Sequence, residues 1–272
     1  MSVSSRLSEV FKKSKSIPFN NSSRIILMSD CHRGDGSWAD TFSKNRNLFH
    51  TALTHYYNNG YTYIELGDGD EMWENKNIED IIVEHSDSFH IMAQFLKEDR
   101  LHLLYGNYDI CKRCYNDVHE GLILKHAESN NKIFLVHGHQ GDFLNDKIWR
   151  ISRFLVRYLW RHLETLGVKD PTNTAKNYRK KDLLEKKISN WSKENNQMII
   201  CGHTHRPVFP KPCESLYFND GSCVHPRCIT GIEICEGKIS LVKWDTRVKD
   251  DGVLYIGKDI VEGPNKLEDY FK

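Results

Sequence analysis

The segment IILMSDCH, residues 25–32, is a short apolar run that ends on an aspartate and a histidine. The same plan recurs in four further segments: Tyr63–Asp70, Leu101–Asp109, Lys132–His139 and Gln197–His205. Short runs rich in Ile, Leu, Val and Tyr are typical of buried strands. In open α/β sheets, ligands bind outside the carboxyl ends of the strands. We therefore expect one metal site built from five strand ends, with the ligands Asp30, His32, Asp68, Asn107, His137, His203 and His205.

The ligand types favour two divalent ions. Imidazole and oxygen ligands without thiolate suit Mn²⁺, Fe or Zn²⁺ better than Mg²⁺. Two ions about 3.5–4 Å apart need one shared carboxylate, and Asp68 is the expected bridge because it stands mid-order among the strands. The remaining ligands divide into two sets: Asp30, His32 and His205 would complete one ion, and Asn107, His137 and His203 would complete the other.

Composition limits the classes of protein that fit. With 272 residues, the chain is long enough for one large domain, with or without an insertion. The net charge of +1 implies no polyelectrolyte partner, and no window approaches the roughly 18–20 apolar residues of a membrane span. The N-terminus lacks the apolar core of a secretory signal. Eight scattered cysteines favour a reducing, cytoplasmic compartment.

One cysteine pair has the CxxC spacing, Cys111 and Cys114. It could belong to a zinc knuckle or a redox dithiol, but a structural zinc site usually needs four ligands. Neither a second CxxC nor a nearby HxxxH is present in the sequence. We therefore expect two ordinary thiols in a loop.

The order of elements divides the chain into three parts. Residues 1–23 are polar and predict a short helix and a linker, the main domain spans 24–245, and a tail spans 246–272. Strands alternate with helices expected at Lys44–Asn59, stopped by Gly60, and at Ile78–Lys97. This alternation predicts parallel βαβ units. After position 205 the pattern is all-β, with strands expected at Ser215–Asn219, Ser222–His225, Cys228–Cys235 and Lys238–Trp244.

Residues 142–196 interrupt the strands with two predicted helices, at roughly 143–166 and 175–195. Thirteen basic and seven acidic side chains give this insertion a charge of +6, against −5 for the rest of the chain. Arg150, Arg153 and Arg157 recur at helical spacing beside an apolar, aromatic-rich stripe. One interpretation is a packed helix with a solvated arginine face. The other is a cap whose arginines bind a phosphorylated or amphiphilic substrate, with peripheral contact to the inner face of a membrane.

Together the five motifs resemble those of the calcineurin-like metallophosphoesterase superfamily. They are D-x-H at 30–32, G-D at 67–68, G-N-x-D at 106–109, H-G-H at 137–139 and G-H-x-H at 202–205. The resemblance implies an α/β fold, a four-layer α-β-β-α sandwich of two mixed sheets, here with a helical cap insertion. It also implies hydrolysis of a P–O bond by a metal-bridging hydroxide, with two divalent ions, Mn²⁺ first among them.

A finer resemblance concerns G-D-G-D-E-M-W at 67–73. It is similar to the G-D-x-x-(D/E)-x-W motif of UDP-2,3-diacylglucosamine pyrophosphatases, which also carry a helical cap, and it implies a pyrophosphatase acting on a UDP-sugar or lipid-like substrate. The alternatives are a phosphodiesterase or phosphatase for another small phosphometabolite, and a non-catalytic scaffold, although no ligand is lost. A nucleic-acid substrate is not favoured, because regularly spaced stacking aromatics are missing.

Three positions leave the chemistry open. Most of the superfamily has histidine at position 108, paired with the aspartate that is here Asp109, whereas this chain has Tyr108. A tyrosine with an ordinary pKa near 10 is a weak acid, so we expect an activated leaving group and catalytic roles for Asp68, Asn107, Tyr108 and Asp109. Asp70 has no explanation from the sequence. His139 is the alternative ligand to His137, which stands first after its strand.

Overall fold

The computed structural model describes residues 2–140, 142, 154 and 178–271. Arg150, Arg153 and Arg157 lie outside the described residues, as does nearly all of the first predicted helix of the insertion. The second predicted helix of the insertion appears as α7 (Tyr178–Glu194). None of the helices in the described ranges is both long and apolar enough to cross a lipid bilayer.

A seven-stranded sheet carries three of the five predicted strands side by side. β2 (Arg24–Met28), β3 (Thr62–Glu65) and β4 (Leu101–Leu104) pair in parallel, as the alternation of strands and helices predicts. On the β2 side follow three antiparallel strands, and on the β4 side one short strand. These are β10 (Cys228–Cys235), β11 (Lys238–Val248) and β12 (Leu254–Lys266), and β5 (Val118–His119).

A five-stranded sheet carries the other two predicted strands, β7 (Lys132–Val136) and β8 (Met198–Cys201), which pair in parallel. The sheet is mixed, because β6 and β7 are antiparallel while its other pairs are parallel. Its order is β1-β6-β7-β8-β9, with β1 (Lys15–Phe19), β6 (Gly121–His126) and β9 (Tyr217–Asn219).

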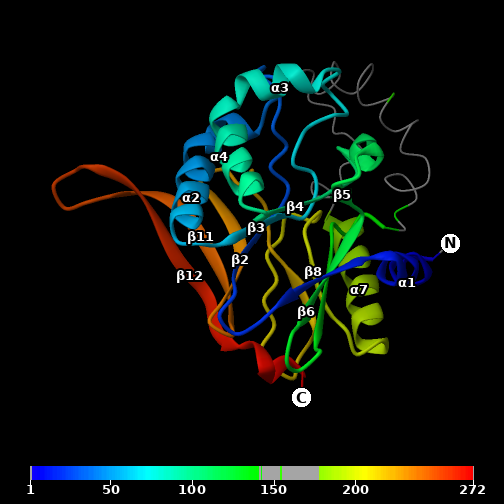
Figure 1. Ribbon diagram of the computed structural model, residues 1–272. Helices are drawn as coiled ribbons and strands as arrows, with labels where there is room; N and C mark the ends of the chain where they lie inside the picture. Colours follow the sequence, from blue (N-terminus) through cyan, green and yellow to red (C-terminus); the bar gives the residue numbers. More distant parts are fainter. Residues whose placement is uncertain (1, 141, 143–153, 155–177, 272) are drawn as a thin grey trace.

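Alternation along the strands builds four layers. In β2, Ile25 and Leu27 enter the core between the two sheets, whereas Ile26 and Met28 face a second core under the helices. That outer layer contains α2 (Arg46–Asn58) and α4 (Ser86–Lys97). On the other side, α1 (Val3–Lys13) and α7 cover the five-stranded sheet through a third core. The predicted α-β-β-α sandwich of two mixed sheets is thereby confirmed (Figure 1).

Three local expectations are wrong. The linker expected after the first helix is strand β1, which pairs with β6 over five residues. The strand expected at Ser222–His225 is a loop whose backbone is held by the neighbouring D-x-H segment. The single helix expected at Ile78–Lys97 is two, α3 (Ile78–Glu84) and α4, because the buried His85 between them leaves helical geometry and pairs with Asp40 at 2.7 Å.

Smaller elements complete the chain. Among the residues that the structure describes, 3-10 helices occur at Phe42–Asn45 (η1), Ile110–Cys114 (η2) and Leu267–Phe271 (η5). The tail predicted for residues 246–272 contains β12, which pairs with β11 over ten positions of an antiparallel ladder. The carboxyl ends of β2, β3, β4, β7 and β8 converge at one end of the sandwich, and this convergence positions the site.

Candidate metal centre

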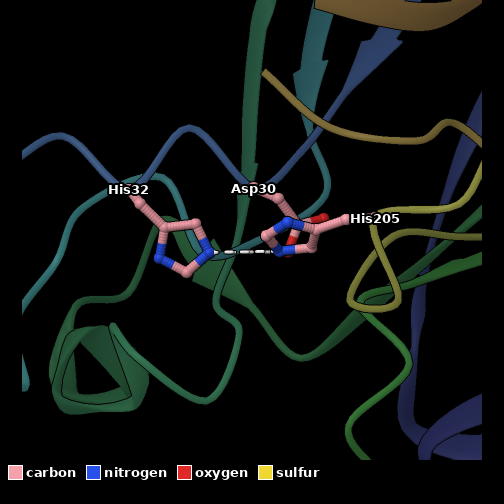
Figure 2. A group of neighbouring side chains, drawn as sticks. All are labelled: Asp30, His32 and His205. Atoms are coloured by element: carbon pink, nitrogen blue, oxygen red, sulfur yellow. Dashed lines mark hydrogen bonds and ion pairs between the residues drawn. The ribbon is translucent and has the colours of Figure 1, made fainter. Parts of the chain in front are cut away.

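The structure brings six of the seven predicted ligands into two adjacent groups. Asp30, His32 and His205 form one group, and Asp68, His137 and His203 form the other, with the ligand atoms of each group within 4.8 Å of one another. Figure 2 shows the first group, in which Asp30 and His32 follow β2 while His205 comes from the loop after β8. The first group is the predicted first set, whereas the second group contains Asp68 with the predicted His137 and His203. That these residues bind metal stays a prediction.

The two groups touch. Asp68 Oδ2 lies 3.0 Å from His137 Nε2 in its own group and 4.0 Å from His32 Nε2 in the other. Asp30 Oδ1 lies 3.0 Å from His205 Nε2 and 3.9 Å from His137 Nε2. Both carboxylates therefore stand between the two groups, and the assignment of the bridge to Asp68 stays a prediction.

The backbone is strained at this site. Five of the six residues of the two groups have left-handed φ angles, at 52° for Asp30, 49° for His32, 51° for Asp68, 67° for His203 and 52° for His205. Each such residue costs about 1–3 kcal/mol and persists where the surroundings enforce it. The strain turns each side chain inward directly after its strand.

Two glycines, Gly106 and Gly202, lie so close to neighbouring side chains that these turns have no room for a Cβ atom. A Cβ on Gly106 would lie 2.1 Å from Asp68 Oδ1, and a Cβ on Gly202 would lie 2.1 Å from Ser29 Oγ. The G-N and G-H motifs thus need glycine because a side chain would collide with the carboxylate behind it or with the hydroxyl that holds it.

Each carboxylate is fixed through one oxygen and presents the other. Asp68 Oδ1 accepts a hydrogen bond from the Tyr108 N–H at 2.8 Å, which leaves Oδ2 for the centre. Asp30 Oδ2 accepts from the His203 N–H at 2.8 Å and from Ser29 Oγ, while its Oδ1 is buried without a hydrogen-bond partner.

Two buried side chains, Ser29 and Asp220, lie behind Asp30. Burial raises the pKa of Asp220 well above its ordinary value, and the charge of Asp30 raises it further. Ser29 Oγ lies within hydrogen-bond distance of both carboxylates, Asp30 Oδ2 and, at 2.8 Å, Asp220 Oδ1. Ser29, itself in contact with Asp220, thus fixes the position of the Asp30 carboxylate.

Second partners also set the orientation of two imidazoles. His137 Nδ1 donates to the Leu66 carbonyl at 2.9 Å, and His32 Nδ1 donates to Glu71 Oε2 at 3.0 Å. In both rings Nε2 is the atom that faces the centre. A carboxylate or carbonyl behind a metal-binding histidine fixes its tautomer and raises its basicity.

The buried ligand atoms fit divalent cations. Asp30 Oδ1, His137 Nε2, His203 Nε2 and both amide atoms of Asn107 are buried without any hydrogen-bond partner. Leaving a buried polar atom unpaired costs about 1–3 kcal/mol, and oxygen and imidazole donors in this mixture suit Mn²⁺, Fe or Zn²⁺. The pattern is what metal coordination would satisfy.

The pKa shifts of the ligand residues are those of a site that favours positive charge. Burial opposes ionisation of Asp68, yet His137 outweighs it and lowers the pKa of Asp68 to about 2. Burial would keep His137 neutral, yet Asp68 and Asp30 raise the pKa of His137 to about 9. Burial and the neighbouring His137 lower the pKa of His203 to about 4. The two buried carboxylates thus give the site a negative charge that favours the binding of a cation.

The predicted catalytic residues after β4 take different positions. Asn107 is buried with both amide atoms unpartnered, and the next residue along the chain donates its backbone N–H to Asp68 Oδ1. Tyr108 packs edge-on to His32, with ring centroids 4.8 Å apart, and over Trp73 at 4.7 Å. Asp109 belongs to neither ligand group, and its oxygens accept from the backbone N–H groups of Gly106, Asp68 and Gly69.

Asp70 belongs to a buried ion network behind the second motif. Its carboxylate lies 2.7 Å from Arg33 Nε and 2.5 Å from Lys112 Nζ. Arg33, with none of its side chain exposed, also reaches Glu65 at 2.8 Å, and Lys112 reaches Asp109 at 2.9 Å. The network clamps the loops after β2, β3 and β4 together, which gives Asp70 the role that the sequence left open.

Two further predicted features are placed as follows. His139 is fully buried with both ring nitrogens unpartnered, but it belongs to neither ligand group. His137 does, in keeping with the preference for the first histidine of that motif. Cys111 and Cys114 lie in η2, where the exposed Cys114 Sγ donates to the Cys111 carbonyl at 3.1 Å.

Sequence reasoning missed the supporting residues. Glu71 stands at the D/E position of the motif at 67–73, which did not reveal its role. Arg33 and Lys112 carry no motif, and only their places beside D-x-H and G-N-x-D could have marked them. Ser29 and Asp220, 191 positions apart in the chain, meet only through the fold.

Replacing Glu71 by alanine should lower Mn²⁺ affinity about 10- to 100-fold, because His32 loses the partner that fixes its ring. Glu71→Gln keeps an acceptor at the same place and should retain most of the affinity. Glu79→Ala removes an exposed carboxylate on α3 and is the matched control. Metal titration by calorimetry is the measurement, and an unchanged affinity in Glu71→Ala would refute the supporting role.

The chain is similar to a known protein family and to solved structures of another protein. The model of the calcineurin-like phosphoesterase superfamily domain matches residues 24–236, which include all five motifs. Among curated protein sequences, none matches the chain. A crystal structure of Vps29 from Chaetomium thermophilum is similar at 10% identity, with a TM-score of 0.43, over 89% of this chain and 97% of that one. The same protein complexed with the RaPID-derived cyclic peptide RT-D3 has a TM-score of 0.33 at 10% identity, over 88% and 95% of the two chains.

Proposed function

The chain belongs to the calcineurin-like phosphoesterase superfamily and is a metallophosphoesterase, and on this premise we propose that it hydrolyses a phosphoanhydride in a small phosphorylated substrate. The observation that carries the proposal is the double ligand group with its unpartnered, inward-facing atoms. The two groups (Asp30, His32, His205 and Asp68, His137, His203) would hold two divalent ions, Mn²⁺ first among them, which would supply Lewis-acid polarisation of a phosphoryl oxygen and a lowered pKa of bound water.

The chain's own residues prepare this reaction. Asp30 and Asp68 remain ionised carboxylates because each is held by backbone N–H donors and faced by imidazoles. His137 presents Nε2 because its Nδ1 proton is held by a carbonyl. Asn107 offers an amide to a substrate or ligand oxygen, since neither of its polar atoms has a partner. Such preorganised polar groups act on charge that develops in the transition state.

The anhydride preference rests on Tyr108 and the motif at 67–73. A phenol donates a hydrogen bond to a leaving oxygen but protonates it poorly at neutral pH. A leaving group that is itself a phosphate needs little protonation. Trp73, the last residue of the motif, is fully buried against Tyr108 and holds that ring beside His32. A UDP-linked sugar or lipid is the substrate that the motif suggests.

The proposal includes a cytoplasmic location for the protein and a substrate-binding role for the basic insertion at 142–196. All eight cysteines are free, which supports a reducing, cytoplasmic compartment. If the basic insertion binds substrate, charge reversal at Arg153 and Arg157 should raise KM. An unchanged KM would support the other interpretation, in which those arginines form the solvated face of a helix. Binding to anionic lipid vesicles would test peripheral membrane contact.

A hydrolysis panel tests the function. Protein loaded with Mn²⁺ should hydrolyse bis-p-nitrophenyl phosphate and should release UMP from an acylated UDP-glucosamine faster than it cleaves cyclic nucleotides or monoesters. Equal rates on all substrates would favour a generalist phosphoesterase. Metal binding without any turnover would refute the proposed hydrolytic activity.

Tyr108→Phe should slow hydrolysis more for poor leaving groups than for good ones. If the hydroxyl stabilises the leaving oxygen, loss of its hydrogen bond should cost about tenfold for a phenyl diester. The cost should be smaller for the p-nitrophenyl diester, whose leaving oxygen carries less negative charge. Metal affinity should not change, because the Asp68 contact uses the backbone N–H. Equal slowing of both substrates would assign Tyr108 to packing.

A further inference from the structure

The strand β12 is a long, open edge of the seven-stranded sheet. It has 13 residues, and among the described strands it pairs with β11 alone. An open edge strand presents a row of unpaired backbone N–H and C=O groups. Proteins usually guard such edges by keeping them short or by placing charges and prolines on them. Most of β12, Leu254–Glu262, contains no proline.

The other sheet edges in the described part of the chain carry such guards. β5, at the opposite edge of the same sheet, has two residues, and β9, at one edge of the five-stranded sheet, has three. β1, at the other edge of that sheet, has five residues and contains Pro18. Of the four edges in the described ranges, β12 is thus the long one without a guard.

One face of the hairpin formed by β11 and β12 is apolar. Val242 of β11 belongs to the core under α2, and its partner in the ladder is Ile260. Val248, further along β11 on the same face, pairs with Leu254. Ile256, between these two positions of β12, packs against the same core. The apolar face therefore consists of Val248, Leu254, Ile256 and Ile260.

Helix α2 covers only part of this face. The rings of His55 in α2 and Trp244 in β11 lie 5.2 Å apart, and beyond this contact the hairpin projects from the sandwich (Figure 1). Leu254 is 66% exposed and Ile260 is 52% exposed. A two-stranded hairpin by itself is marginally stable in water, so a further strand beside β12 would stabilise it.

The charged side chains in the middle of β12 have partners within the same sheet. Lys258 Nζ donates to Glu233 Oε1 of β10 at 2.7 Å, and the Asp259 carboxylate pairs with Arg247 of β11. Because both charges are compensated, they oppose an incoming strand less than free charges would.

The sequence of β12 favours a second copy of this chain in one register. In two identical antiparallel strands related by a two-fold axis, paired side chains lie on the same face. The ladder with β11 is regular over Leu254–Ile260 and irregular beyond it, and Gly257 is the midpoint of that regular part. An axis at Gly257 sets Leu254 opposite Ile260 of the second copy. An axis at Lys258 or at Asp259 would set like charges opposite each other.

We propose that the chain forms a two-fold symmetric dimer in which β12 pairs with β12 of a second copy, antiparallel about Gly257. The two seven-stranded sheets then form one continuous sheet. Each copy uses the same edge, so the assembly closes at two chains. A standard interface buries ~1,600 Å², and one strand pair buries less, so we expect a dissociation constant on the order of micromolar.

Sedimentation velocity measures this association directly. With rising concentration the wild-type protein should change from the single chain of 31.8 kDa to a dimer. Leu254→Lys and Ile260→Glu should each weaken dimerisation at least about tenfold, because each places a charge opposite an apolar side chain of the second copy. Both positions are exposed in the single chain, so both variants should fold. Val83→Lys, at a position of α3 that is 76% exposed, is the matched control and should dimerise as wild type.

A mixture of the two variants tests the register. The ammonium introduced by Leu254→Lys would face the carboxylate introduced by Ile260→Glu, while the other pair of the mixed dimer is again Leu254 with Ile260. The mixed dimer should therefore form about tenfold more tightly than either variant alone.

Three results would overturn the proposal. The first is a wild-type protein that stays monomeric at about 0.1 mM, far above the expected dissociation constant. If that monomer bound zwitterionic lipid vesicles, the apolar face would belong to a membrane contact instead. The second is folded variants that dimerise as wild type, and the third is a mixture that associates no more tightly than its components.

Discussion

Asp68→Ala should lower the rate of diester hydrolysis by at least about 10³-fold and should remove both metal ions together. Each ion in a two-metal site contributes several kcal/mol of transition-state stabilisation, and every 1.36 kcal/mol is a factor of ten in rate. Asp68 Oδ2 is the carboxylate oxygen that lies 3.0 Å from His137 and 4.0 Å from His32, one histidine of each group. Metal content by elemental analysis and turnover of bis-p-nitrophenyl phosphate are the two readouts.

Asp30→Ala separates a bridging ligand from a terminal one. We expect it to lose the ion held with His32 and His205 and to keep part of the binding at the other group. Asp80→Ala removes an exposed carboxylate from α3 and should change neither readout. If Asp68→Ala retained one full equivalent of metal while Asp30→Ala lost both, Asp30 would be the bridge instead.

Arg33→Met should destabilise the fold by about 3–5 kcal/mol, because it leaves Glu65 and Asp70 as buried charges without a partner. Arg33 contacts both carboxylates, at 2.8 Å and 2.7 Å, and none of the three side chains is more than 2% exposed. A loss of this size is a large part of the 5–15 kcal/mol typical of a domain. The shift of the denaturant midpoint at constant slope is the measurement.

Two comparisons make this result specific to the buried network. Arg46→Met removes half-exposed pairs with Glu84 and Asp87 and should cost about 1 kcal/mol or less. Adding Glu65→Gln and Asp70→Asn to Arg33→Met should recover part of the stability, since the uncompensated charges disappear. A loss in Arg33→Met no larger than in Arg46→Met would show that the network does not stabilise the fold.

The strand ends were predictable because their chemistry is local. A short apolar run followed by Asp or His predicts both a strand and a candidate ligand, and the structure gathers six of the predicted side chains into two groups. The edge strand β1 was missed because KSIPF is short, polar at its start and interrupted by Pro18. It pairs with β6 from more than 100 positions away in the chain, a contact that no local pattern encodes.

The supporting shell was not predictable for a related reason. Asp70 looks out of place in its motif until Arg33 and Lys112, from the loops after β2 and β4, are folded against it. Ligands can be read from motifs, whereas residues that act through their neighbours depend on tertiary structure.

Titration of metal-free protein with Mn²⁺ tests the dinuclear centre most directly. Protein stripped with a chelator should be inactive toward bis-p-nitrophenyl phosphate, should bind two equivalents of Mn²⁺ per chain, and should regain turnover as the second equivalent binds. Turnover that survives complete metal removal, or binding of fewer than two equivalents at full activity, would contradict a reaction carried by the two ligand groups.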